Sequence, residues 1–337
     1  MTITLLWLQL AGAAVFILFA SNYLAKSADV IAIKTGLGRS FAGVVLLATA
    51  TSLPELGTGV SSIVVFDAPD LAAGDAFGSN IFNLMIIGLL DLYWRNGPIL
   101  NRVSTTSVAV GALGILIISI AVIALFVHDA TSALNSLPIS PFSVVIFLVF
   151  LASMYMIYVI GRRQDSPEDE SELPLYEGVS LRRSILIYAL AALVVVGAAF
   201  WLAQIGDGLT HAMGWDASFV GTQFLAFSTS LPELAASFAA IRINAPELAI
   251  TGVLGSNLFN MGFILLMDDI ALVGQPLWGA ISQVHIMTAM FAILMTAVVI
   301  VALIFPGRSR PRSFITIEAT LLIGLYIVSS VFVFKLG

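Results

Sequence analysis

Long apolar runs alternate with short polar segments along the whole chain. Breaking the sequence at its charged and Gly/Pro-rich points leaves ten apolar stretches, each long enough to cross a bilayer as a helix of roughly 20 residues. Continuous apolar runs exclude an outer-membrane barrel, whose strands alternate apolar and polar positions. The pattern therefore predicts an all-α polytopic membrane protein with ten transmembrane helices. The expected spans are 4–26, 40–65, 70–92, 104–127, 139–160, 184–207, 218–241, 246–267, 281–305 and 314–334.

Basic residues indicate the orientation of these helices, because cytoplasmic loops accumulate Lys and Arg. If the N-terminus is outside, thirteen of the fourteen basic residues fall in cytoplasmic loops, and only Lys335 does not. A missed or added span would destroy this alternation. We therefore expect both termini to lie outside. The first apolar stretch has no basic segment before it, so we interpret it as a span and not as a cleaved signal.

The longest polar stretch divides the ten spans five and five. Residues 161–183 contain an acidic run with a proline, Asp165 to Glu172, which is more typical of a solvated, disordered segment than of a cation site. We expect residues 1–160 to form a first five-helix unit, 161–183 a cytoplasmic linker, and 184–337 a second five-helix unit.

Two polar motifs occur once in each half. Residues 40–56 (SFAGVVLLATATSLPEL) recur as 218–234 (SFVGTQFLAFSTSLPEL), with eleven of seventeen positions identical. Residues 78–83 (GSNIFN) recur as 255–260 (GSNLFN). Because five spans separate the copies, matching helices run in opposite directions. Such inverted repeats are typical of secondary transporters, whose binding site lies near the membrane midplane between discontinuous helices.

Each long motif carries a glutamate near the middle of its span. A carboxylate at that depth costs several kcal/mol. A protonated or snorkelling side chain would explain one such residue, but it explains two at matching positions poorly, so we interpret Glu55 and Glu233 as ion ligands. The preceding residues, Pro54 and Pro232, cannot donate a helical hydrogen bond and so free backbone carbonyl groups.

Further oxygen ligands are expected from hydroxyl and amide side chains three or four residues apart, which share a helical face. These side chains are Thr51, Ser52, Ser79 and Asn83 in the first half and Thr229, Ser230, Ser256 and Asn260 in the second. Polar side chains also act as packing contacts between membrane helices, and Asn80 and Asn257 fit either role. An all-oxygen set suits hard cations such as Ca²⁺ and Na⁺, and not zinc or copper. Two carboxylates balance one divalent cation or two monovalent ones.

Composition narrows the function further. With 59% hydrophobic residues, 10% charged residues and a net charge of −6, the chain leaves no room for a separate soluble domain or a basic nucleic-acid surface. The absence of cysteine excludes disulfides and thiol nucleophiles. We expect no cofactor and no obligate protein partner. The expected partners are the lipid bilayer and inorganic cations.

These motifs resemble the alpha-repeats of the cation/Ca²⁺ exchanger superfamily, and specifically those of the prokaryotic Na⁺/Ca²⁺ exchangers. The resemblance implies that each five-helix unit is a sodium/calcium exchanger membrane region, with Ca²⁺ held by Glu55 and Glu233 and by carbonyl groups at Thr51 and Thr229. It also implies that the first and sixth spans form a sliding gate. The implied sodium ligands are Ala48, Ser52 and Ser79 in one half and Ala226, Ser230 and Ser256 in the other.

Two positions depart from the pattern of that family. Archaeal members can carry an aspartate where this chain has Asn260, which leaves the site poorer by one potential charge. Asp75 occupies a position where the family usually has asparagine. It fits two roles equally, a carboxylate that restores charge near the outer mouth or a solvated residue at a helix end.

The expected function is a secondary antiporter that exchanges Ca²⁺ for Na⁺ by alternating access at a site between spans 2, 3, 7 and 8, in the inner (plasma) membrane. H⁺-coupled Ca²⁺ exchange is the nearest alternative, because protons compete for buried carboxylates. A cation channel with paired carboxylates as its filter belongs to a different class. An enzyme is not expected, since neither repeat offers a His or Lys base beside its serines.

Overall fold

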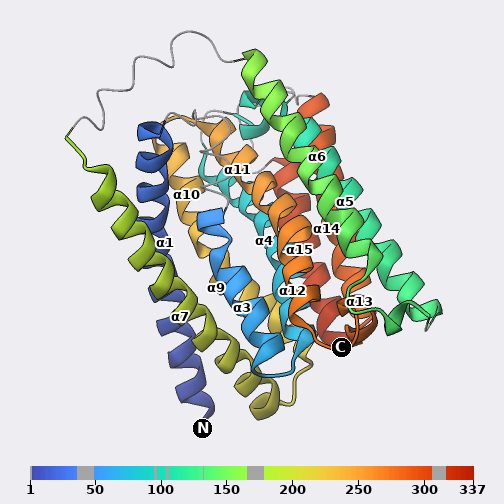
Figure 1. The fold of residues 1–337 in the computed structure, drawn as a ribbon. Coiled ribbons are helices and arrows are strands. Elements are labelled where there is room, and N and C mark those ends of the chain that lie inside the picture. Colours follow the sequence, from blue (N-terminus) through green and yellow to red (C-terminus); the bar gives the residue numbers. More distant parts are fainter. Residues whose placement is uncertain are drawn as a thin grey trace.

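The computed structural model is a bundle of helices joined by short connections (Figure 1). It describes residues 2–35, 49–94, 97–103, 106–131, 133–164, 178–305 and 316–337. Every regular element in these ranges is helical, which confirms the all-α prediction. The longer helices are α1 (Ile3–Lys34), α3 (Leu53–Val64), α4 (Pro69–Tyr93), α5 (Thr106–Ala130), α6 (Pro141–Gln164), α7 (Leu181–Met213), α10 (Leu231–Arg242), α11 (Pro246–Phe259), α14 (Val284–Ile304) and α15 (Ile317–Leu336). The short elements are η2 (Ile99–Arg102), η3 (Leu134–Ser136), α8 (Ala217–Val220), η5 (Gly221–Leu225), α9 (Ala226–Thr229), η6 (Asn260–Ile264), α12 (Leu265–Ala271) and α13 (Leu277–Ala280).

Eight helical segments in the described ranges are long and apolar enough to cross a membrane. They are Ile3–Ile31, Pro69–Tyr93, Ser107–Ala130, Pro141–Ile160, Leu181–Met213, Pro246–Ala271, Val284–Ile304 and Ile317–Leu336. A ninth candidate consists of Ala217–Thr229 and Leu231–Arg242, which meet at 42°. All nine coincide with expected spans. The remaining one, 40–65, is described only from residue 49 on, so the count of ten spans and the sidedness of the termini stay predictions.

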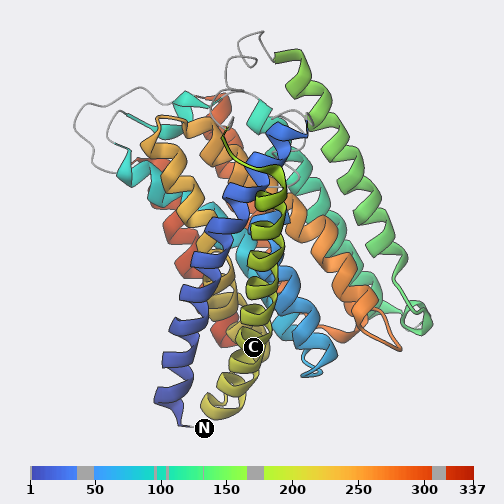
Figure 2. The ribbon, with the colours of Figure 1, turned by 60° about the vertical axis from the view of Figure 1, so that its left-hand side comes forward.

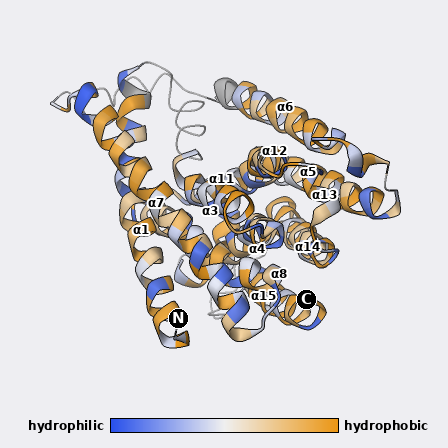
Figure 3. Ribbon diagram, turned by 60° about the horizontal axis from the view of Figure 1, so that its bottom comes forward, coloured by the Kyte–Doolittle hydropathy of each residue, from blue (hydrophilic) through white to orange (hydrophobic). Residues whose placement is uncertain are grey.

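The helices that carry the repeated polar motifs lie in the middle of the bundle. In α4, and in the span formed by α11, η6 and α12, 72% of the most apolar segment is buried, against 22% for α6 and α15. Figure 3 shows that the outer helices α5 and α6 are mostly hydrophobic along their length. This arrangement is that of a membrane protein whose polar groups are shielded from lipid by apolar helices.

Helices α1 and α7 pack against each other along one edge of the bundle (Figures 1 and 2). At their lower end the rings of Trp7 and Trp215 meet edge to face, 6.2 Å apart. The last residue, Gly337, lies against Asp216. Both termini therefore lie at one end of the bundle, here called the terminal end. The opposite end, where α6 ends and α7 begins, is called the linker end.

The two halves differ in the regularity of their central helix. Helix α4 is α-helical throughout, whereas its counterpart contains the π-helical turn η6, which holds one extra residue. The insertion is visible in the spacing of equivalent residues in the two halves. Asn260 follows Asn83 by 177 residues, but Asp269 follows Asp91 by 178. The match of the two aspartates is structural, because each accepts a hydrogen bond from the backbone N–H eight residues later.

The span that contains η6 is longer than the sequence indicated. The sequence predicts its end at residue 267, because the spans are divided at charged positions and two aspartates, Asp268 and Asp269, follow. The helix instead continues to Ala271, and neither aspartate is exposed. Charged residues usually mark the ends of membrane helices, but these two are enclosed by neighbouring helices and not by solvent.

Candidate ion-binding site

The two repeated glutamates lie where a membrane helix breaks and restarts. The breaks fall at Ser52 (φ −93°, ψ 8°) and Ser230 (φ −87°, ψ 7°), which have nearly identical backbone conformations. A proline follows two residues later in each case and cannot donate a hydrogen bond to the preceding turn. Glu55 and Glu233 thus lie in the first turn of α3 and α10. The partial positive charge at a helix N-terminus favours a carboxylate there.

Glu55 is surrounded by polar groups from both halves of the chain. Its side chain is 1% exposed, and its Oε1 accepts a hydrogen bond of 3.3 Å from the Ser230 hydroxyl. The hydroxyls of Thr229 and Ser79 also face this carboxylate and lie 3.4 Å from each other. The other oxygen, Oε2, has no hydrogen-bond partner in the described part of the chain.

Glu233 has the equivalent neighbours from the opposite repeats. It is 3% exposed, and the side chains of Thr51 and Ser256 face it. Neither of its oxygens accepts a hydrogen bond within the described ranges, and the fully buried hydroxyl of Ser52 has no partner there either. The carboxylates of Glu233 and Glu55 interact electrostatically. The bundle therefore encloses two neighbouring carboxylates whose oxygens are largely unsatisfied.

The amide side chains tie the two central helices together. Asn83 donates from Nδ2 to Oδ1 of Asn257 (3.0 Å), and Asn257 donates to the backbone oxygen of Asn80 (3.2 Å). Of the two roles open to Asn257, the structure therefore supports the packing contact. The Oδ1 atom of Asn83 and both amide atoms of Asn260 are buried without a partner among the described atoms.

Helix α4 contacts the span of α8, η5 and α9 directly through its backbone. A Cβ atom at Gly78 would lie 2.5 Å from the backbone oxygen of Thr222 and 2.8 Å from Cβ of Ala226. The absence of a side chain at Gly78 therefore allows the two helices to approach closely. At Gly255, by contrast, a Cβ would meet no described atom within 4 Å. Ala48 lies outside the described residues.

Asp75 lies next to Glu55 and Thr229, whereas the sequence left its position open. The side chain is 1% exposed, which excludes a solvated position at the helix end. Its Oδ1 accepts a hydrogen bond of 2.8 Å from the Thr229 hydroxyl, and the carboxylates of Asp75 and Glu55 interact electrostatically. Asparagine at this position would be neutral, so the chain adds a third carboxylate next to the repeated pair.

The structure brings most of the predicted ligands into one region. Around Glu55 lie Ser79, Thr229 and Ser230, and around Glu233 lie Thr51 and Ser256. Within the described ranges no three His, Asp or Glu side chains come together as one metal-binding group. Neutral oxygens, such as those of the hydroxyl groups around Glu55 and Glu233, would therefore have to complete any cation site there.

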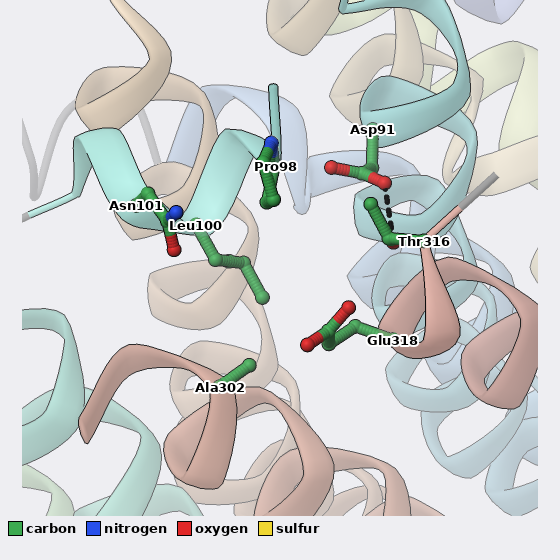
Figure 4. Close-up of a pocket in the computed structure, with 7 residues that line it drawn as sticks. All are labelled: Asp91, Pro98, Leu100, Asn101, Ala302, Thr316 and Glu318. Carbon is green, nitrogen blue, oxygen red and sulfur yellow. Dashed lines mark hydrogen bonds between the residues drawn. The ribbon is translucent and has the colours of Figure 1, made fainter. Parts of the chain in front are cut away.

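A small cavity of about 10 Å³ lies elsewhere, at the linker end (Figure 4). It is lined by Asp91, Pro98, Leu100, Asn101, Ala302, Thr316 and Glu318. Asp91 accepts hydrogen bonds from the Ile99 N–H and the Thr316 hydroxyl, so it holds the end of α4 to the next segments. Its counterpart Asp269 accepts the N–H groups of Leu277 and Ser140. These two aspartates have structural roles.

Comparison with known proteins assigns the chain to a family. The family model described as sodium/calcium exchanger protein matches residues 5–162 and 183–335. The chain belongs to the sodium/calcium exchanger family. A curated relative, the sodium/calcium exchanger MaX1 of Methanosarcina acetivorans, is 31% identical over 290 residues, which cover 78% of this exchanger and 82% of the relative.

Solved structures share the fold of this exchanger. The sodium-calcium exchanger NCX_Mj aligns with a TM-score of 0.62 at 19% identity, over 97% of this chain and 98% of that one. The H⁺/Ca²⁺ exchanger CAX aligns with a TM-score of 0.62 at 14% identity, over 98% and 88%. The resemblance of the motifs to the cation/Ca²⁺ exchanger superfamily is thereby confirmed. The protein is a multi-pass membrane antiporter of cations, in a family of transporters and not of enzymes.

Proposed function

We propose that this exchanger moves Ca²⁺ across the inner (plasma) membrane in exchange for Na⁺, at a site between Glu55 and Glu233. The observation that carries the proposal is the pair of buried carboxylates at matching helix breaks, with three of their four oxygens lacking a hydrogen-bond partner in the described part of the chain. Carboxylate and neutral oxygens are the ligands that hard cations prefer. The match to MaX1 supports sodium as the driving ion.

Charge balance explains why such a site would exchange ions. Two carboxylates neutralise one Ca²⁺ or two Na⁺. Without a bound cation, a doubly negative site inside the membrane is costly, so the change between facing states is favourable only when the site is loaded. We propose that residues 1–160 and 184–337 act as inverted units around this site, and that α1 and α7 move against the remaining helices.

The proposed ligands come in matching sets from the two halves. Calcium is assigned to Glu55, Glu233 and the carbonyl groups of Thr51 and Thr229. Sodium is assigned in addition to the hydroxyls of the helix breaks and central helices and to two backbone positions. These are Ser52, Ser79, Ser230, Ser256, Ala48 and Ala226, with the amide oxygens of Asn83 and Asn260 as further candidates.

Proton coupling is the second candidate, and the fold shared with the H⁺/Ca²⁺ exchanger CAX favours testing it. Protons and sodium ions would compete for the same carboxylates. A channel is a third possibility in a different class. For reconstituted vesicles, both alternatives predict results that differ from those predicted for sodium-driven antiport.

The driving ion can be determined with purified protein in proteoliposomes. We expect an outward Na⁺ gradient at equal pH to drive uptake of ⁴⁵Ca²⁺, and a pH gradient without Na⁺ to drive little or none. Protein-free liposomes and liposomes with equal Na⁺ on both sides are the controls. Uptake that follows only the pH gradient would show that protons, and not sodium ions, drive the exchange. Single-channel currents across a planar bilayer would reject antiport altogether.

Asp75 is expected to strengthen calcium binding from beside the main pair. Asp75→Asn removes its negative charge and keeps its size, so the Ca²⁺ concentration for half-maximal uptake should rise roughly tenfold, which corresponds to about 1.4 kcal/mol. The matched control is Asp129→Asn, an exposed residue at the end of α5. If Asp75→Asn and the control needed the same Ca²⁺ concentration for half-maximal uptake, Asp75 would not be part of the site.

A further inference from the structure

Asp268 is a fully buried acid to which the main site gives no role. It is 0% exposed, and neither of its carboxylate oxygens has a hydrogen-bond partner in the described ranges. Its neighbour Asp269 differs, because it accepts two backbone hydrogen bonds. One aspartate of the pair therefore holds the fold together, while the other is buried without such a function.

The carboxylate of Asp268 points at the backbone of α3. A Cβ at Gly59 would lie 2.6 Å from Oδ1 and 2.9 Å from Oδ2 of Asp268, so the carboxylate occupies space that only a glycine leaves open. Gly59 follows Glu55 by four residues, about one helical turn. As α3 runs toward the terminal end (Figure 1), Asp268 lies on the terminal side of the main pair.

Other buried oxygens without a partner belong to Asp75 and to α3, the helix that Asp268 contacts. Asp75 interacts electrostatically with both Glu55 and Asp268, and its Oδ2 has no partner among the described atoms. On α3, Thr58 precedes Gly59 directly and Ser62 follows it by three residues; both hydroxyls are 0% exposed and also have no partner there. The region thus offers carboxylate and hydroxyl oxygens and no nitrogen or sulfur ligand from these side chains.

The repeat indicates that an acid is not needed here for packing. Leu90 occupies the position equivalent to Asp268 in the first half, and it is also 0% exposed. An unpaired buried carboxylate is unfavourable by several kcal/mol in a membrane unless a proton or a bound cation neutralises it. The charged side chains that act on Asp268 and Asp75 in the described region are other carboxylates.

We propose that Asp268 and Asp75, with hydroxyls of α3, form a second cation site that binds one Na⁺. An all-oxygen set selects a hard cation. Asp268 adds one negative charge that a monovalent ion would balance, and the neighbouring charge of Asp75 would strengthen the attraction for that ion. This site lies about one turn of α3 from Glu55 on the terminal side, and it has no acidic counterpart toward the linker end. This second site goes beyond the proposed function, and its test measures sodium binding and not calcium transport.

Equilibrium binding of ²²Na⁺ to the purified full-length protein tests this site. Asp268→Asn and Asp268→Leu should each bind one Na⁺ fewer per molecule than the wild type. Their dissociation constant for ⁴⁵Ca²⁺ should stay within about threefold of the wild-type value. The leucine variant carries the residue that the first repeat uses, so it guards against a folding defect. Thr58→Val should weaken the same sodium site, and Asp129→Asn is the control that changes neither ion.

Two results would overturn the proposal. One is an unchanged number of bound Na⁺ in both Asp268 variants. The other is loss of Na⁺ and Ca²⁺ binding together in a folded Asp268→Leu protein, which would make Asp268 part of the main site. Failure of the proposed function has a different signature: the wild type would bind no Ca²⁺, whatever its Na⁺ count.

Discussion

Replacing Glu55 or Glu233 by glutamine is expected to abolish Na⁺-gradient-driven ⁴⁵Ca²⁺ uptake into proteoliposomes. Glutamine keeps the size of the side chain but removes one of the two charges that balance Ca²⁺. Removing one partner of a buried ion pair destabilises it by about 3–5 kcal/mol. A change of that size lowers Ca²⁺ affinity by roughly a hundredfold to more than a thousandfold. Uptake by either variant should therefore equal that of protein-free liposomes.

A suitable control for this experiment is Glu247→Gln. Glu247 also lies in the first turn of a helix, α11, but it is exposed at the linker end. This variant should transport at the wild-type rate. Size-exclusion chromatography and circular dichroism would establish that all three variants are folded. Uptake near the wild-type rate in Glu55→Gln or Glu233→Gln would reject the assignment of the site.

Gly78→Ala is expected to disrupt the site through the backbone. The added methyl group would lie 2.5 Å from the backbone oxygen and 2.6 Å from Cα of Thr222, and backbone atoms cannot rotate away. Overpacking of this kind usually destabilises a protein by roughly 1–3 kcal/mol. Separation of α4 from η5 would also displace Ser79, which is next in sequence and faces Glu55. We expect a lower thermal unfolding temperature in detergent and an uptake rate at least about tenfold lower.

Gly324→Ala provides the matched comparison. Gly324 lies inside the membrane helix α15, where an added Cβ would meet no described atom within 4 Å. Alanine favours a helix interior over glycine by roughly 0.5–1 kcal/mol, so this variant should be as stable as the wild type or slightly more so. If Gly78→Ala had the same unfolding temperature and uptake rate as Gly324→Ala, the inferred close contact between α4 and η5 would be rejected.

The repeated motifs made most of the fold and the centre of the site predictable. Glu55 and Glu233 could be recognised because a carboxylate inside an apolar span is rare, and a second at the matching position is rarer still. The proline after each serine predicted an interrupted helix, and the breaks at Ser52 and Ser230 agree with that prediction. These features are local in sequence and repeated, so no knowledge of tertiary contacts was needed.

Other parts of the site depend on contacts between distant segments. Asp75 could be solvated or buried as far as the sequence indicated, and only the packing of α4 against α8, η5 and α9 shows that it is enclosed. Asn257 could bind an ion or join helices, and its two hydrogen bonds across to α4 favour the second role. Asp268 lies just beyond the end predicted for its span, because the sequence does not reveal which helices cover a helix end.

The π-helical turn η6 makes the two halves of the exchanger unequal. Two identical inverted units would give a transporter whose inward- and outward-facing conformations are related by a two-fold rotation and have equal free energy. One extra residue in the second central helix, and an acid in place of a leucine beyond it, remove that equality. A difference of only about 1.4 kcal/mol between the two conformations would favour one of them tenfold at rest. The exchanger should therefore have a preferred resting orientation and bind its ions with different affinity from each side of the membrane.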